Sequence, residues 1–79
     1  MKTIKVRYLD TLESERGMNE EAVNTRAASP EELYRELSSR HSLSTASATL
    51  QTSVNNERVP LNTPLWQGDL VTFRMPAAN

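Results

Sequence analysis

The sequence predicts an α+β domain, in which a mixed sheet of four to five strands has one main helix packed across one face. Three observations lead to this class. Residues 3–9 and 70–73, near the two ends of the chain, alternate apolar and polar side chains with the two-residue period of a strand. Between them, residues 29–41 carry helical spacing and helix caps. Because one helix cannot cover both faces of a sheet, the other face is expected to stay at least partly open.

The first half of the chain predicts a hairpin with a long connection. In residues 3–9, basic side chains separate the apolar ones, as in a strand with one face in a core. Residues 10–21 are polar and contain glycine, so they form a connection with room for a short helical turn, anchored by Leu12. Residues 22–28, through Val23, form the return strand.

The helix has the clearest local signal in the sequence. Ser29 is a favourable N-cap, Pro30 suits the first helical position, and Glu32 lies three residues after the cap, which completes a capping box. Leu33 and Leu37, four residues apart, form the apolar stripe that faces the sheet.

The second half predicts a second hairpin and a final strand. Leu43 is expected to pack into the core from a loop rich in serine and threonine. Residues 49–61 form a hairpin around Asn55–Asn56, because asparagine tolerates the positive φ of tight turns. A turn at 67–69 then leads into the last strand at 70–73. The element order is strand, strand, helix, strand, short strand, strand.

Composition limits the functional classes. The 79 residues make one domain without cysteine, so neither a disulfide framework nor a thiolate metal site is expected. Nine basic and ten acidic residues are scattered along the chain, which argues against a nucleic-acid binder. Charges interrupt the N-terminal apolar run, so neither a signal peptide nor a membrane span is expected. A cytoplasmic protein fits best.

No set of acid, base and nucleophile is visible, so no catalytic residue, metal or cofactor is expected. His41, the single histidine, is assigned to helix capping or the surface, where a cation near a helix C-terminus is favoured. Glu31 and Glu32 are first-turn helix residues rather than a catalytic pair. Trp66 is expected to cover the end of the core rather than to anchor a partner.

Taken in order, four segments resemble one family, the small subunit of molybdopterin synthase within the MoaD/ThiS group of ubiquitin-like sulfur carriers. The segments are KVRYLDTLESERG (5–17), SPEELYREL (29–37), SVNNERV (53–59) and PLWQGDLVTF (64–73). They resemble the opening strand with its leucine and glycine, the capped helix, the valine-asparagine hairpin, and the last turn and strand. The element order is that of the ubiquitin-like β-grasp, in which the first and last strands lie side by side and parallel at the sheet centre.

The resemblance implies a carrier tail. In that family the terminal carboxylate is adenylated by an E1-like activating enzyme and converted to a thiocarboxylate, and the tail then enters the large subunit of molybdopterin synthase. The resemblance therefore implies a β-grasp domain at 1–73 and a flexible tail at 74–79, acting as a non-catalytic subunit with no bound cofactor. The partner-binding tail residues would be Phe73, Arg74, Met75, Pro76, Ala77, Ala78 and Asn79.

The tail departs from the family pattern at its end. Phe73 and Pro76 match, and Ala77 and Ala78 fit small positions, but Asn79 stands where the family has the first of two glycines. Glycine lets a chain thread a narrow channel and present its carboxyl carbon without steric cost, so poor sulfur carriage is expected. The alternatives are a β-grasp interaction or regulatory module that no longer carries sulfur, a shortened carrier, or a carrier for thiamine or cysteine synthesis.

The open sheet face is expected to add partner contacts close to the tail. Tyr8 and Leu9, together with Phe73 and Met75, are the candidates, because they lie on adjacent central strands. Strand parity assigns some of the four to the core instead, and the sequence alone does not sort them.

Overall fold

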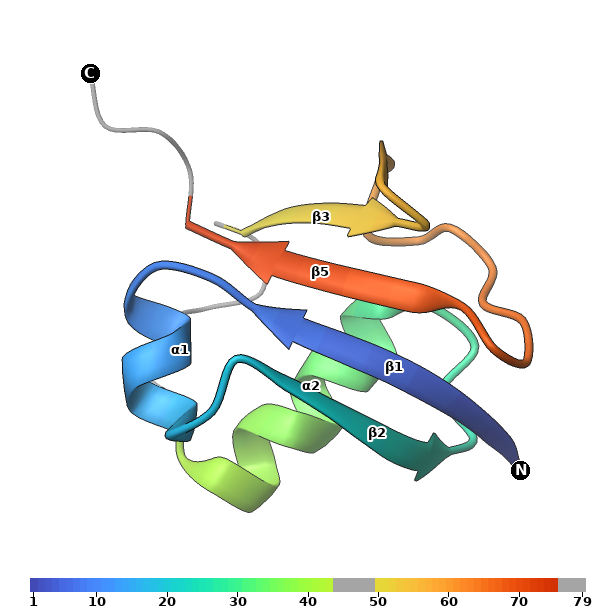
Figure 1. The fold of residues 1–79 in the computed structure, drawn as a ribbon. Helices are drawn as coiled ribbons and strands as arrows, with labels where there is room; N and C mark the ends of the chain where they lie inside the picture. Colours follow the sequence, from blue (N-terminus) through green and yellow to red (C-terminus); the bar gives the residue numbers. More distant parts are fainter. Residues whose placement is uncertain (44–49, 76–79) are drawn as a thin grey trace.

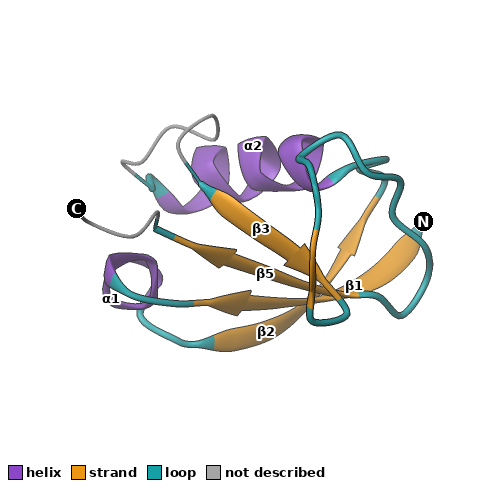
Figure 2. Cartoon of the chain, turned by 90° about the horizontal axis from the view of Figure 1, so that it is seen from above, coloured by secondary structure: helices purple, strands orange, loops and turns teal. Residues whose placement is uncertain are grey.

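The computed structural model describes residues 1–43 and 50–75, and it confirms a five-stranded mixed sheet with one main helix. The elements in chain order are β1 (Lys2–Tyr8), α1 (Thr11–Arg16), β2 (Glu20–Thr25), α2 (Pro30–His41), β3 (Gln51–Val54), β4 (Glu57–Arg58) and β5 (Leu70–Arg74). Helix α2 crosses one face of the sheet, and the short helix α1 lies at the end of the sheet where β1 finishes (Figure 1). Seen along the sheet, α2 lies on one side only (Figure 2).

The strand order is β2-β1-β5-β3-β4, so the first and last strands are neighbours inside the sheet. They run parallel, with Val6 opposite Val71 and Tyr8 opposite Phe73. The other neighbouring pairs are antiparallel. This is the central parallel pair that the element order predicts, and a parallel pair requires a crossover connection, which here contains α2.

The core fills the space between α2 and the sheet. Each long strand contributes alternate side chains to it, as the two-residue period predicts. The buried apolar residues are Ile4, Val6, Tyr8, Leu12, Val23, Ala27, Leu33, Tyr34, Leu37, Leu43, Leu50, Leu65, Val71 and Phe73. The predicted anchors Leu12, Leu33, Leu37 and Leu43 are all among them.

The predicted N-cap and hairpin turn are present, although Glu32 bonds to the residue before the N-cap and not to the N-cap itself. The Ser29 side chain accepts a hydrogen bond from the Glu32 backbone N–H at 3.4 Å, and the Glu32 carboxylate accepts one from the backbone N–H of Ala28 at 3.3 Å. Asn55 and Asn56 both have positive φ, 53° and 69°, as a two-residue hairpin turn of this kind requires.

The boundaries of β2 differ from the sequence prediction. Strand β2 begins at Glu20 and ends at Thr25, because pairing with β1 starts opposite Arg7 and includes two glutamates. Helix α2 ends at His41, in agreement with the predicted helical range. Within the described residues, no helix is long and apolar enough to cross a membrane.

Candidate functional site at the carboxyl end of β5

Strand β5 is held firmly up to Phe73. The Phe73 side chain is 0% exposed, and its ring meets that of Tyr34 on α2 edge to face, with 5.1 Å between centroids and 63° between planes. The Phe73 carbonyl accepts a hydrogen bond from the Leu9 backbone N–H at 3.1 Å, just beyond the end of β1. The last buried side chain of the strand is therefore fixed by the helix on one side and by the backbone of β1 on the other.

Beyond Phe73 the chain is less buried. Arg74, the last residue of β5, is exposed, and Met75 is partly buried against the core. Strand β5 thus ends one residue past the expected boundary at 73, and the division into domain and tail stays a prediction. The predicted tail residues Pro76, Ala77, Ala78 and Asn79 lie outside the described residues.

The structure sorts the four candidates for partner contact. Tyr8 and Phe73 face each other across the parallel pair and are both 0% exposed, on the side covered by α2. The prediction that these two side chains contact a partner from an open face is therefore wrong, because strand parity points them inward. Leu9 and Met75 are partly exposed and keep their place as candidates.

A polar network secures the end of β1 beside this site. The Tyr8 hydroxyl donates to the Glu21 carboxylate at 2.6 Å, and the Arg16 guanidinium donates two hydrogen bonds to the same carboxylate at 2.9 and 2.8 Å. The side chains of Arg16 and Glu21 are only 17% and 16% exposed. The network therefore joins α1, β1 and β2. The sequence pattern does not reveal this network and indicates only one anchor for residues 10–21, Leu12.

The network shifts the titration of its members. The hydrogen bonds from Arg16 hold the pKa of the Glu21 carboxyl below its usual 4.5, although burial acts in the opposite direction. Burial, and then the Glu21 carboxylate, raise the pKa of the Tyr8 hydroxyl well above 10.0. The hydrogen bonds to Glu21 raise the pKa of Arg16. At neutral pH the network is therefore a paired carboxylate and guanidinium with a neutral phenol.

The face of the sheet opposite α2 is polar and basic. One row of side chains crosses all five strands on this face, as the strand registers show: Glu20, Arg7, Thr72, Ser53 and Arg58. Lys5 lies two residues before Arg7, and Arg74 lies two residues after Thr72, so both are on the same face. We call Lys5, Arg7, Arg58 and Arg74 the basic face.

Part of the basic face is neutralised internally. The Glu20 carboxylate lies 3.2 Å from the Arg7 guanidinium and 3.9 Å from the Lys5 ammonium group. Among the described residues, neither Arg58 nor Arg74 makes an ion pair. The two guanidinium groups without a carboxylate partner thus lie on the side of the sheet formed by β4, β3 and β5.

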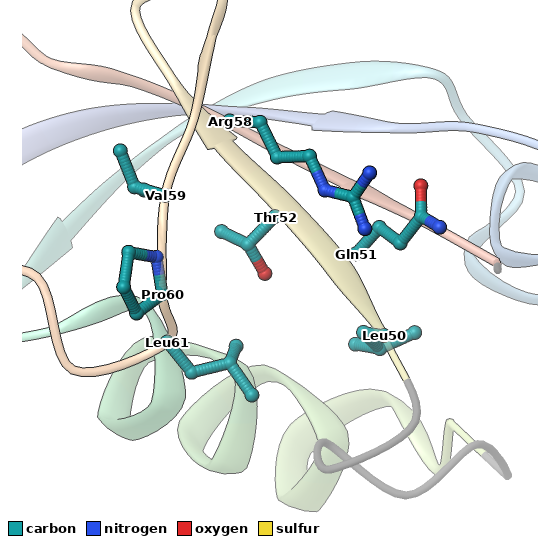
Figure 3. A pocket seen from close by; sticks show the side chains of 7 residues that line it. All are labelled: Leu50, Gln51, Thr52, Arg58, Val59, Pro60 and Leu61. Carbon is teal, nitrogen blue, oxygen red and sulfur yellow. The ribbon is translucent and has the colours of Figure 1, made fainter.

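A pocket of about 440 Å³ borders the basic face at the edge of β3 (Figure 3). The pocket lies just beyond the end of β4. There the Val59 N–H still donates to the Thr52 carbonyl, but Pro60 has no N–H, so the pairing of the two strands stops. The chain then departs toward α2, where the Leu61 carbonyl accepts from the Glu31 N–H. The lining residues are Leu50, Gln51, Thr52, Arg58, Val59, Pro60 and Leu61.

Trp66 is not part of the core. Its side chain is 71% exposed, while its neighbour Leu65 is 3% exposed, so the expectation that Trp66 covers the core end is wrong. Asp69 closes the turn: its carboxylate accepts from the Trp66 N–H at 2.8 Å, and its own N–H donates to the Trp66 carbonyl at 3.1 Å. This closure directs Leu65 inward and leaves the tryptophan outside.

The remaining candidates show no catalytic arrangement. The Glu31 carboxylate is paired with Arg35 at 2.6 Å across one helical turn. The Glu32 carboxylate accepts a hydrogen bond from the Ala28 N–H just before the helix begins. His41 lies in the last turn of α2 and is partly buried. Residues 1–43 and 50–75 contain no group of three histidine, cysteine, aspartate or glutamate side chains that could hold a metal ion.

No protein-family model matches the chain, and a search of curated proteins found no match. Solved structures do match. A Pyrococcus furiosus protein, described as a candidate molybdopterin converting factor, subunit 1, shares 23% identity with a TM-score of 0.79, over 98% of this chain and 100% of that one. Small archaeal modifier protein 1 of Haloferax volcanii gives 14% identity and a TM-score of 0.82, over 98% and 100% of the two chains.

A third match is a chain in the complex of subunits 1 and 2 of the molybdopterin-converting factor from Helicobacter pylori. It shares 20% identity with a TM-score of 0.67, over 98% of this chain and 97% of that one. These comparisons establish the fold as the ubiquitin-like β-grasp, over nearly the whole length of each chain. Their descriptions include the subunit type that the sequence motifs resemble.

Proposed function

We propose that this chain is a small ubiquitin-like subunit of the sulfur-carrier type, which works in molybdopterin synthesis by inserting the segment after β5 into a large catalytic subunit. In this role it is a non-catalytic cytoplasmic component that binds no cofactor of its own. The sequence resemblance to the MoaD/ThiS group supports the pathway. The matched Helicobacter pylori chain, which belongs to a complex of subunits 1 and 2, supports a large-subunit partner.

The observation that carries the proposal is the position and anchoring of β5. The strand lies inside the sheet, parallel to β1, and Phe73 fixes its end between α2 and the backbone of Leu9. A segment that must enter another protein needs a rigid base, because misplacement of about 1 Å weakens a reaction geometry severely. Arg74 follows this base directly and is exposed, and Met75 still packs against the edge of the core.

Binding to the large subunit tests the proposal. The full chain is titrated by calorimetry with the large subunit of the molybdopterin-converting factor from the same organism, and a version ending at Arg74 serves as the matched control. We expect saturable binding by the full chain and a loss of at least about tenfold in affinity for the shortened one, because the segment would supply buried contacts. Absence of binding by the full chain would refute the proposal.

Sulfur carriage is tested separately from docking. The full chain is incubated with an E1-like activating enzyme, ATP and a sulfur donor, and intact mass shows whether sulfur has replaced a carboxyl oxygen. The sequence-based prediction of poor carriage concerns residues 76–79 and stays a prediction. Full conversion would contradict it and would leave the docking proposal intact.

A further inference from the structure

We propose that the basic face, through Arg58 and Arg74, docks onto an acidic surface of the same large subunit, next to the entrance of the cleft that receives the chain after β5. This inference rests on the proposed function and adds the chemistry of the contact. It adds a charged contact to the apolar one expected from the sequence, of which only Leu9 and Met75 remain as candidates because Tyr8 and Phe73 are in the core.

Arg58 and Arg74 lie close to the point where the chain continues beyond β5. Arg74 follows the anchored Phe73 directly, so any protein that encloses the chain beyond β5 must also meet the surface around Arg74. Gln51 lies opposite Arg74 in the antiparallel register of β3 and β5. Arg58 lies opposite Ser53, two residues farther along β3 and on the same face. The rim of such a cleft would therefore cover both arginines.

Charge also supports this inference. Among the described residues, Arg58 and Arg74 have no carboxylate partner. Lys5 and Arg7, on the same face but toward β2, are paired with the Glu20 carboxylate. An interface that buried these guanidinium groups without a counter-charge would be unfavourable. Carboxylates are the fitting partners, because a guanidinium binds a carboxylate through two parallel hydrogen bonds. The large subunit should therefore present aspartate or glutamate side chains at this rim.

The pocket beside β3 favours a protein surface over a nucleic acid. Arg58 belongs to both the basic face and the pocket, and its side chain lies next to that of Gln51 (Figure 3). The aliphatic side chains of Leu50, Val59 and Leu61 also line the pocket, which suits an apolar side chain flanked by carboxylates. In addition, Glu20 pairs with Lys5 and Arg7, so these two basic side chains have less positive charge to offer a phosphate backbone.

Charge reversal tests the inference. Arg58→Glu and Arg74→Glu are compared with Arg26→Glu, which makes the same charge change at an exposed position after the end of β2, at the opposite end of the sheet. All variants are first checked for native folding by circular dichroism and thermal unfolding. Binding to the large subunit is then measured by calorimetry at low and at high sodium chloride concentration.

We expect Arg58→Glu and Arg74→Glu each to weaken binding by about tenfold or more at low salt, with Arg26→Glu close to wild type. We also expect high salt to weaken wild-type binding and to reduce the difference between variants. If the wild type binds, and Arg58→Glu and Arg74→Glu both bind as tightly as the wild type, the inference is overturned and the proposed function stands. If the wild type does not bind at all, both fail.

A nucleic-acid control completes the test. The wild-type chain is mixed with short single-stranded DNA and RNA and followed by fluorescence anisotropy. We expect no saturable binding at physiological salt. Saturable binding that Arg58→Glu and Arg74→Glu abolish would assign the basic face to phosphate and would overturn the inference.

Discussion

The two faces of the sheet differ in almost every physical respect, although they are built from the same strands. On β5, the side chains of Val71 and Phe73 point toward α2 and are fully buried, while Arg74 points away and is exposed. On β1, Val6 is buried, and its neighbours Lys5 and Arg7 are on the charged side. The inner face specifies the fold, and the outer face is the one that we propose for partner binding.

If the proposal holds, this contrast explains how a short chain has both a fold and an interaction surface. A domain of this size has little apolar surface to spare, and most of its aliphatic and aromatic strand residues are used in the core. The outer face therefore carries mostly polar side chains, among them the four long basic ones, whose aliphatic stems also cover the sheet. Recognition through such a face depends on charge more than on apolar area.

The largest effect is expected from breaking the inner face. Phe73→Ala should lower the free energy of unfolding by about 3–5 kcal/mol, because it removes a fully buried ring that packs against Tyr34. Urea denaturation measures it. The matched outer-face change, Arg74→Ala, should alter stability by less than about 0.5 kcal/mol. Similar losses for the two variants would contradict the division between the faces.

The polar network at the end of β1 should give the next largest effect. Glu21→Gln should destabilise the domain by about 1–3 kcal/mol at neutral pH. The change weakens the pairing with Arg16, and the buried Tyr8 hydroxyl then donates to an amide oxygen, which is a weaker acceptor than a carboxylate. Chemical denaturation at pH 7 measures the loss. Glu20→Gln, on the exposed outer face, is the matched control and should cost much less.

The same network predicts a pH dependence. The folded pKa of Glu21 lies below its usual 4.5, so the unfolded chain takes up a proton first as the pH falls. The contribution of Glu21 to stability is complete when the pH is above the usual pKa of 4.5, and it is lost as the pH falls through the lower pKa of the folded state. The stability difference between wild type and Glu21→Gln should therefore shrink under acidic conditions. A difference that stays constant from pH 7 to about pH 3 would rule out this source of stability.

A smaller effect is expected at the start of α2, the element that covers the inner face. Ser29→Ala should cost about 0.5–1 kcal/mol, the lower part of the range for an N-cap, because the hydrogen bond to Glu32 is long at 3.4 Å. Thermal unfolding provides the measurement. Ser39→Ala, at an exposed position within the same helix, should have no such cost, and a larger effect there than at Ser29 would argue against the cap.

The smallest effect is expected at Trp66, which belongs to neither face. Trp66→Ala should change stability by less than about 0.5 kcal/mol, since the side chain is 71% exposed. Leu65→Ala, one residue earlier, should cost about 2–5 kcal/mol. Denaturation curves of the two variants check this contrast. A large loss from Trp66→Ala would restore the expectation that the tryptophan covers the core.

The features that the sequence predicts well depend on residues close together in the chain. Ser29, Pro30 and Glu32 define a helix start within four positions, and the Asn55–Asn56 turn depends only on local backbone preference. The two-residue period likewise marks the strands, although it does not settle that Tyr8 and Phe73 face the core.

The features that the sequence does not predict depend on distant pairs or on the detail of a turn. Arg16 and Glu21 meet only because α1 packs at the end of β1, and Arg58 joins Arg7 on one face only through the registers of four strands. Charges that look scattered along the chain thus gather on the sheet. The exposure of Trp66 depends on which way the turn closed by Asp69 directs two adjacent side chains.

The most direct test of the central claim is to map the contact surface by nuclear magnetic resonance. The labelled full chain is titrated with the unlabelled large subunit, and backbone amide signals are followed. We expect the signals of Arg58, Thr72, Arg74 and Met75 to change, while those from the solvent side of α2, such as Arg35, stay unaltered. Changes on α2 or around Trp66, with the outer face of the sheet unaffected, would contradict the central claim.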